Sequence, residues 1–395
     1  MHDTLLSRFR GAYLGAALGE QIGTQAAVAG GDTPTGAGST SLVQLPRWVK
    51  QPFCNPKLNQ PAFWTDQILA QTSMLLDGKQ GVVQPQSAAV PQPPVSRPPV
   101  SQPTVKASKA RTEFMARLLP LALQHHDQPQ VLQHHIAQSW HEHQAAFDAL
   151  QADALSPDPP PDTRPDTRSD ASTFDSPDFW AALILGQTIS LILRERFRPP
   201  TLIPQVLRDL DLPDLPAVAP VLSQLTAIQT WLTQSADLAT VARRLRTVQA
   251  TGGQATGGEA TGGEDAIAPE LLGSGGLAVV LYSFLSSTAD PEAMLLRFAR
   301  LQAALSCSPA LTGTILGSLA GLYGGLPSLP FEWRQTYRAE QSPPSDQPET
   351  LTEAVLFHQA DRLLAHWSGV CPTADWWSRH PHVGITAPPR VIQLE

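Results

Sequence analysis

The chain has 395 residues, a formal net charge of −8 and a pI near 5.8. This acidic balance argues against a nucleic-acid-binding protein, which needs a clustered basic surface. Hydrophobic residues make up 42% of the chain, enough for a sizeable core, whereas 38 prolines indicate long stretches without regular structure.

The cysteines and apolar segments bear on the compartment. Cys54, Cys307 and Cys371 are widely spaced and odd in number, which does not suggest a disulfide framework and favours the cytoplasm. We expect no signal peptide before residue 8. The longest apolar runs, residues 180–193 and 271–285, are too short to cross a bilayer, so we expect no membrane association.

The first predicted element is a helix with glycine at every fourth position. Residues 8–23 read RFRGAYLGAALGEQIG, which places Gly11, Gly15, Gly19 and Gly23 on one face. Each glycine costs a helix about 1 kcal/mol relative to alanine, so a face of four needs a reason. The usual reason is a second backbone that approaches too closely for a Cβ. Residues 313, 317 and 321 form a matching glycine face, and we expect the two helices to pack together in the core.

Three low-complexity segments interrupt the chain after this helix. Residues 82–108 are proline-rich and are expected to be extended, and residues 156–177 repeat a Pro-Asp-Thr-Arg unit. Residues 250–264 repeat Ala-Thr-Gly-Gly-Gln/Glu and are typical of a flexible loop. We interpret all three as loop insertions within one domain.

Between the insertions, apolar residues recur at three- and four-residue spacing, which predicts helices. In chain order these cover residues 111–124, 130–150, 178–197, 215–233, 236–248, 277–285, 292–305, 311–323 and 351–366. Asp290 and Pro291 suit the cap and first position of one of them. No run alternates with period two. The predicted fold class is therefore all-α and multihelical.

Four segments of the chain carry motif-like sequences: residues 8–23, 64–68, 115–120 and 307–313. Together they resemble the ADP-ribosylglycohydrolase family, which includes the dinitrogenase reductase-activating glycohydrolase. Residues 8–23 follow that family's R-F-x-G-x-x-x-G-x-A-x-G-D-A-x-G opening, with Glu20 in the aspartate place. Residues 64–68 (WTDQI) correspond to its T-D-D-T, and residues 115–120 (MARLLP) to its M-R-x-x-P with one extra residue. Residues 307–313 (CSPALTG) correspond to G-D-T-D-T-T-G. The resemblance implies one helical domain over residues 3–338, followed by a proline-containing linker and helical tail over residues 339–395.

The same resemblance implies a cleft for two Mg²⁺ ions, but most of its carboxylates are replaced here. Thr65, Asp66 and Thr312 match the family pattern, whereas Gln67, Ser308 and Ala310 stand where aspartates are expected. One carboxylate where the family uses about four cannot balance two dications, because Mg²⁺ needs hard, charged oxygen ligands. Glu20 is an extra carboxylate that would at best serve a single metal ion. An alternative reading makes Thr65 a helix cap and Asp66 a first-turn acid.

The substrate side departs from the family as well. Its glycine-rich nucleotide loop corresponds here to the proline-rich residues 82–108, which offer few backbone donors. Arg117 is a weak candidate for substrate contact, and a structural role is the competing reading. We therefore expect a vestigial cleft, no bound metal and no cofactor.

The preferred function is that of a pseudoenzyme, a cytoplasmic binding or regulatory protein with a protein partner or an ADP-ribose-like ligand. The alternative is an active hydrolase of ADP-ribosyl or related N-glycosidic bonds that uses one metal ion, magnesium, or none. A scaffold that recruits proteins through its tail and its proline-rich segments is the third reading. The tail, which contains Trp367, Trp376 and Trp377, either folds back over the helices or anchors a partner.

Overall fold

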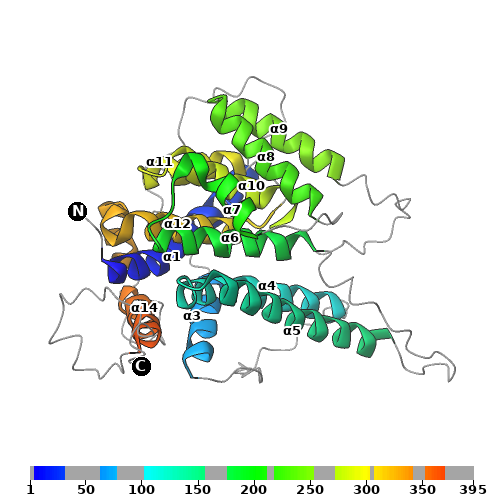
Figure 1. The fold of residues 1–395 in the computed structure, drawn as a ribbon, viewed down its shortest axis with the longest axis vertical. Helices are drawn as coiled ribbons and strands as arrows, with labels where there is room; N and C mark the ends of the chain where they lie inside the picture. The colour runs from blue at the N-terminus through cyan, green and yellow to red at the C-terminus, as the bar shows by residue number, and fades with distance from the viewer. Residues whose placement is uncertain are drawn as a thin grey trace.

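The computed structural model describes residues 4–31, 63–77, 102–155, 176–210, 218–252, 272–302, 307–340 and 352–369. All regular secondary structure in these ranges is helical, which confirms the predicted all-α fold class (Figure 1). The helices are α1 (Leu5–Gly31), α3 (Phe63–Leu76), α4 (Gln102–Gln124), α5 (Pro129–Leu155), α6 (Pro177–Leu193), the 3-10 helix η3 (Pro199–Thr201), α7 (Leu202–Leu210), α8 (Ala219–Thr233), α9 (Leu238–Gly252), α10 (Gly273–Ser286), α11 (Pro291–Gln302), α12 (Pro309–Ser328), α13 (Phe331–Glu340) and α14 (Glu353–Ser368).

The central feature is the antiparallel packing of α1 on α12, backbone against backbone. A Cβ on Gly15 would overlap the carbonyl of Gly317, and one on Gly19 would overlap that of Gly313. Gly11 faces Gly321 in the same way, and Gly23 faces Pro309. Real Cβ contacts are not found so close to backbone atoms, so these positions require glycine. The predicted contact between the two glycine faces is confirmed.

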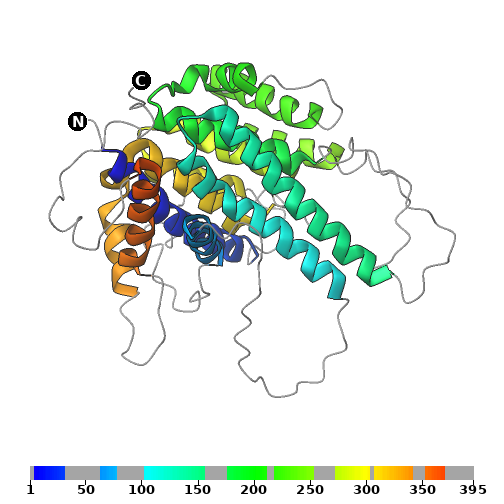
Figure 2. The ribbon, with the colours of Figure 1, turned by 60° about the horizontal axis from the view of Figure 1, so that its bottom comes forward.

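Other helices cover this central pair. The α4 and α5 helices lie side by side as an antiparallel pair, joined by a tight turn (Figure 2). The α6 helix is buried along nearly its whole length and packs among α4, α5, α10 and α12. Its N-cap is Ser176, whose hydroxyl accepts a hydrogen bond from the backbone N–H of Asp178 at 3.3 Å.

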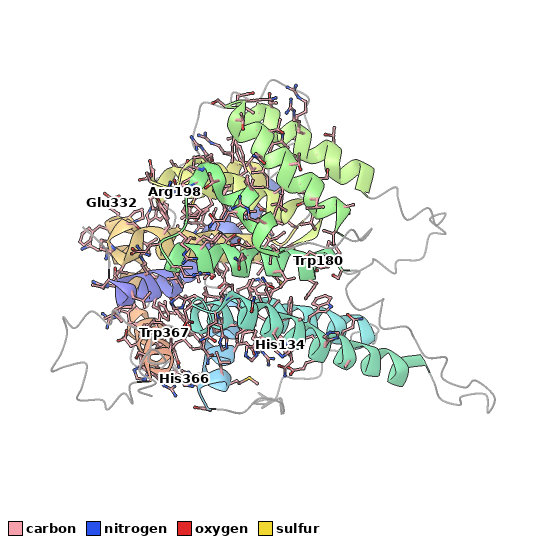
Figure 3. All side chains as sticks on the ribbon, viewed as in Figure 1. His134, Trp180, Arg198, Glu332, His366 and Trp367 are labelled. Carbon is pink, nitrogen blue, oxygen red and sulfur yellow. The ribbon has the colours of Figure 1, made fainter. Side chains whose placement is uncertain are left out.

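The helical tail folds back onto the same core. In α14, Leu356, Leu363 and Leu364 are buried and belong to the cluster that includes the apolar residues of α1. Asp361 accepts two hydrogen bonds from Arg10 of α1, at 2.8 and 2.6 Å. Near the end of α14, the Trp367 ring packs against His126 at 4.9 Å, and its Nε1 donates to Asp127 at 3.3 Å. Figure 3 labels Trp367 on this helix. Trp376 and Trp377 lie outside the described residues.

One predicted insertion boundary was wrong. Residues 102–108 were assigned to the extended proline-rich segment, but α4 begins at Gln102. Proline is tolerated in the first turn of a helix, where its missing N–H has no intrahelical partner, so Pro103 does not stop this one. At the third insertion, α9 continues through Gly252. The remaining residues of the three insertions, 82–101, 156–175 and 253–264, lie outside the described residues.

Two short helices were not predicted. The α7 helix follows Pro199 and Pro200 of η3, and it buries Leu202, Ile203 and Val206. The α13 helix buries Trp333 and Tyr337 despite a polar sequence. Both are short, at 9 and 10 residues, so tertiary packing stabilises them. Along the described helices, none is both long and apolar enough to cross a lipid bilayer.

Candidate functional site

Glu20 and the start of α3 form the best-defined part of the predicted cleft. One carboxylate oxygen of Glu20 accepts the backbone N–H of Trp64 at 2.8 Å. The other accepts the backbone N–H of Thr65 at 2.8 Å and its hydroxyl at 2.7 Å. Glu20 therefore caps α3 from a different helix and satisfies backbone donors that have no partner within α3.

The electrostatics of Glu20 follow from this burial. The side chain is only 4% exposed, and desolvation raises the pKa of its carboxyl group. The hydrogen bonds from Thr65 and Trp64 oppose that rise, and the nearby negative charge of Asp66 adds to it. The carboxylate is already in contact with three donors, so its lone pairs are largely committed to the helix junction.

The next two positions of α3 are more exposed than Thr65. Asp66 is exposed and lies in the first turn, where the helix dipole favours a negative charge. Partial desolvation raises the pKa of its carboxyl group. Gln67 is half-buried and carries no charge. Asp66 is thus the carboxylate of the predicted cleft whose oxygens remain open to solvent.

The second predicted segment forms the start of α12. The Ser308 hydroxyl is the N-cap and accepts the backbone N–H of Leu311 at 3.4 Å. Thr312 is buried, and its hydroxyl lies 2.8 Å from the carbonyl oxygen of Ser308 and 3.1 Å from Oε1 of Gln302. Ala310 offers no side-chain donor or acceptor. These side chains serve the local structure of α12.

The α1 helix connects the two segments. Over a single turn, Glu20 contacts Thr65, whereas Gly19 and Gly23 face Gly313 and Pro309. Both helix starts therefore lie against the same part of α1. Within the described ranges, no hydrogen bond or ion pair links Thr65 or Asp66 directly to Ser308 or Thr312.

The donor set fits two Mg²⁺ ions poorly. The ions would need several free carboxylate oxygens, and only the exposed Asp66 supplies them without breaking a cap. No group of three or more His, Cys, Asp or Glu side chains among the described residues is arranged to hold a metal ion.

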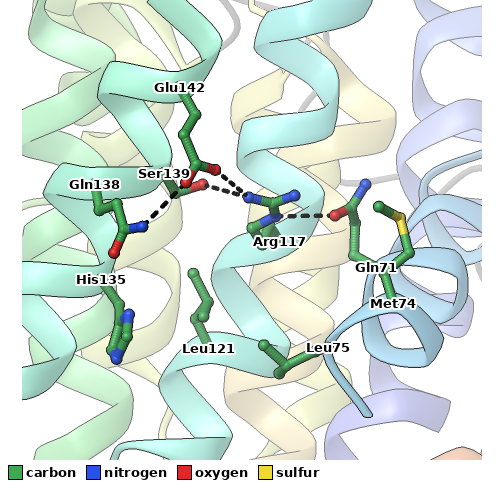
Figure 4. Close-up of a pocket in the computed structure, with 9 residues that line it drawn as sticks. All are labelled: Gln71, Met74, Leu75, Arg117, Leu121, His135, Gln138, Ser139 and Glu142. Atoms are coloured by element: carbon green, nitrogen blue, oxygen red, sulfur yellow. Dashed lines mark hydrogen bonds and ion pairs between the residues drawn. The ribbon is translucent and has the colours of Figure 1, made fainter. Parts of the chain in front are cut away.

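Arg117 lies in a separate cluster that joins three helices (Figure 4). Its Nε donates to Gln71 of α3 at 3.0 Å, and another guanidinium nitrogen lies 3.0 Å from Glu142 and 3.4 Å from Ser139, both on α5. The cavity beside it has a volume of about 30 Å³, enough for one or two water molecules but not for a nucleotide. The structural reading of Arg117 accounts for all of these contacts.

Sequence reasoning missed the role that Glu20 plays. It treated this residue as an extra metal ligand and Thr65 as the cap of its own helix. In the structure α3 begins at Phe63, so Thr65 lies inside the first turn and is itself bonded to Glu20. Nothing local in the sequence signals a cap supplied from a residue 45 positions away.

Comparison with family models and with curated proteins found no match. Among solved structures, the chain is similar to one described as an ADP-ribosylglycohydrolase-related protein complex. The sequence identity is 16% and the TM-score is 0.44, over 91% of this chain and 99% of the other.

Proposed function

We propose that this protein is a catalytically degenerate relative of the ADP-ribosylglycohydrolases that acts as a binding or regulatory protein. The observation that carries the proposal is the state of Glu20. Its two oxygens accept hydrogen bonds from the first turn of α3, at 2.7 to 2.8 Å, and hold that helix against α1. These three bonds occupy most of the lone pairs of the carboxylate, so a metal ion here would compete with bonds that hold the helix junction.

The rest of the motif positions support the same proposal. Gln67 and Ala310 bring no negative charge, and the hydroxyl of Ser308 caps α12. A pair of Mg²⁺ ions carries four positive charges, and desolvating so much charge without matching carboxylates is costly. Arg117 is engaged with α3 and α5, so it is not poised for a phosphate group.

For the binding role, the sequence leaves two classes of partner, a protein or an ADP-ribose-like ligand. The widely spaced cysteines favour the cytoplasm as the compartment.

A hydrolase that uses one metal ion or none is the second candidate. The observation that favours it is Asp66, an exposed carboxylate whose pKa is raised by partial desolvation. Such a group is able to bind one cation or to accept a proton from water.

The test combines calorimetry with an activity assay. Mg²⁺ and Mn²⁺ are titrated into the protein with and without ADP-ribose, and release of ADP-ribose from an arginine-modified protein is measured at saturating metal. The expected result is no metal-dependent release. Metal-dependent turnover that disappears in Asp66→Ala, but persists in Asp77→Ala just after the end of α3, would establish the hydrolase instead.

A further inference from the structure

A second cavity lies among α7, α8, α10 and α11. It is lined by residues of these helices together with η3 and the turn between α8 and α9, and its volume is about 660 Å³. Sites for small organic ligands commonly have volumes of about 300–1,000 Å³. Figure 1 shows α8, α10 and α11 in the upper part of the molecule, away from α14 at the lower left. No residue singled out from the family motifs lines this cavity.

One part of its wall is aromatic and apolar. The rings of Trp231 and Tyr282 meet edge to face, with centroids 6.0 Å apart. Ile203 and Leu285 are buried beside them. The Tyr282 hydroxyl donates to the carbonyl oxygen of Ala236 at 3.2 Å, which ties the α8–α9 turn to α10 and holds the ring in place. Such a rigid wall suits a planar apolar group.

Two arginines of α11 line the same cavity. Arg297 donates to the carbonyl oxygen of Ser286 and to the hydroxyl of Ser287, so its guanidinium is held at the end of α10. Arg300 is one helical turn further on and is exposed. Within the described part of the chain, no ion pair or hydrogen bond engages the Arg300 side chain.

Asp237 is the acidic residue that lines the cavity, and its carboxylate is hydrogen-bonded to Thr240. It lies directly before α9, and hydrogen bonds from the side chain and backbone of Thr240 lower the pKa of its carboxyl group. This pattern is that of an N-cap, which keeps the carboxylate at the helix start. The positive charges of the two arginines therefore exceed the negative charge of Asp237, and the cavity favours a negatively charged ligand.

We propose that this cavity binds a small organic anion, with its ring against Trp231 and Tyr282 and its carboxylate or phosphate group paired with Arg300. Guanidinium groups match the planar geometry of carboxylates and of phosphate oxygens, which is why an arginine rather than a lysine suits this position. The proposal does not depend on whether the cleft at Glu20 is catalytically inactive, because the two sites share no residue.

The test uses three probes of similar size in ligand-observed NMR titrations of the full chain. Phenyl phosphate and phenylacetate carry the two anionic groups, and benzyl alcohol is the neutral comparison. At least one anion is expected to bind more tightly than benzyl alcohol. Arg300→Gln should weaken that anion's binding about tenfold or more, since a hydrogen bond to a charged group is lost.

Two further variants locate the site. Gln229→Trp adds an indole at an exposed position of the cavity rim and should block the anion. Arg244→Gln removes an exposed arginine of α9 that does not line the cavity. This control variant should bind the anion with the same affinity as the parent. The proposal is overturned if neither anion binds, if benzyl alcohol binds equally well, or if Arg300→Gln or Gln229→Trp leaves the affinity unchanged.

Discussion

Thr65 donates both its backbone N–H and its hydroxyl to one carboxylate oxygen of Glu20, at 2.8 and 2.7 Å. These two bonds join α1 to α3 at a buried point, next to the glycine face that joins α1 to α12. Two residues that the sequence resemblance assigned to a metal cleft, Glu20 and Thr65, thus hold a helix junction here. The consequences for stability are open to direct test.

We expect Glu20→Gln to lower the free energy of unfolding by about 1–3 kcal/mol, the cost of leaving buried polar groups unsatisfied. An amide has a single oxygen for three donors, and its NH₂ group would face the N–H groups of α3. Thr65→Val should cost about 1 kcal/mol, because only the hydroxyl is lost. Urea denaturation measures both, and Thr65→Ser, which keeps the hydroxyl, is the control. Parent-like stability of Glu20→Gln would mean that the cap does not matter.

Replacing Gly15 or Gly317 by leucine should cost about 3 kcal/mol or more, the upper end of the usual range for overpacking. The added atoms meet backbone of the opposite helix rather than a side chain that is able to turn away. Thermal and urea unfolding of each variant measure the loss. Ala354→Leu, at an exposed position of α14, is the control and should stay within about 0.5 kcal/mol of the parent. If Ala354→Leu lost as much stability as the glycine variants, the loss could not be attributed to contact between the backbones of α1 and α12.

His143 should make the protein less stable in acid. Burial, followed by the positive charge of Arg117, lowers the pKa of His143 to about 4 from 6.5. Its ring packs edge-on against Phe114 at 6.0 Å, and its Nε2 is buried without a hydrogen-bond partner. Between these two pH values the unfolded chain binds a proton that the folded chain does not. Stability therefore falls as the pH drops from about 6.5 to about 4, by up to about 3 kcal/mol.

The measurement is the melting temperature at pH 7 and at pH 4.5. His143→Leu should lose less stability between these values than the parent does. His358→Leu, which removes a histidine from an exposed position of α14, is the comparison. A pH dependence that is identical in His143→Leu and the parent would contradict the assignment.

Leu363→Ala in the helical tail should cost about 2–5 kcal/mol, as for a leucine buried in any core. Leu363 is fully buried, and α14 packs on α1, α3 and α4. Val355 is 40% exposed, so Val355→Ala is expected to cost much less. Chemical denaturation compares the two. If both variants unfold at the same denaturant concentration as the parent, α14 does not unfold cooperatively with the rest of the domain.

Much of the fold could be predicted from the sequence because its signals are local. The repeat of glycines at 11, 15, 19 and 23 predicts a face for close helix contact, and the partner glycines carry the same spacing. Asp290 and Pro291 mark the start of α11, where Asp290 accepts the backbone N–H of Ala293 at 2.9 Å. Apolar periodicity and helix caps of this kind involve residues only a few positions apart, so they can be recognised in the sequence.

What only the tertiary structure decided are the contacts between distant segments. The sequence singles out Glu20, Thr65 and Asp66 as candidates. It does not predict that Glu20 is hydrogen-bonded to the first turn of α3, because no local pattern says which distant segments come into contact. In the same way, Trp231, Tyr282 and Arg300 come from three helices with no shared motif, and only the packing of those helices forms the cavity. The free energy of burial depends on which surfaces of the helices pack together, and the spacing of residues along the chain does not specify these surfaces.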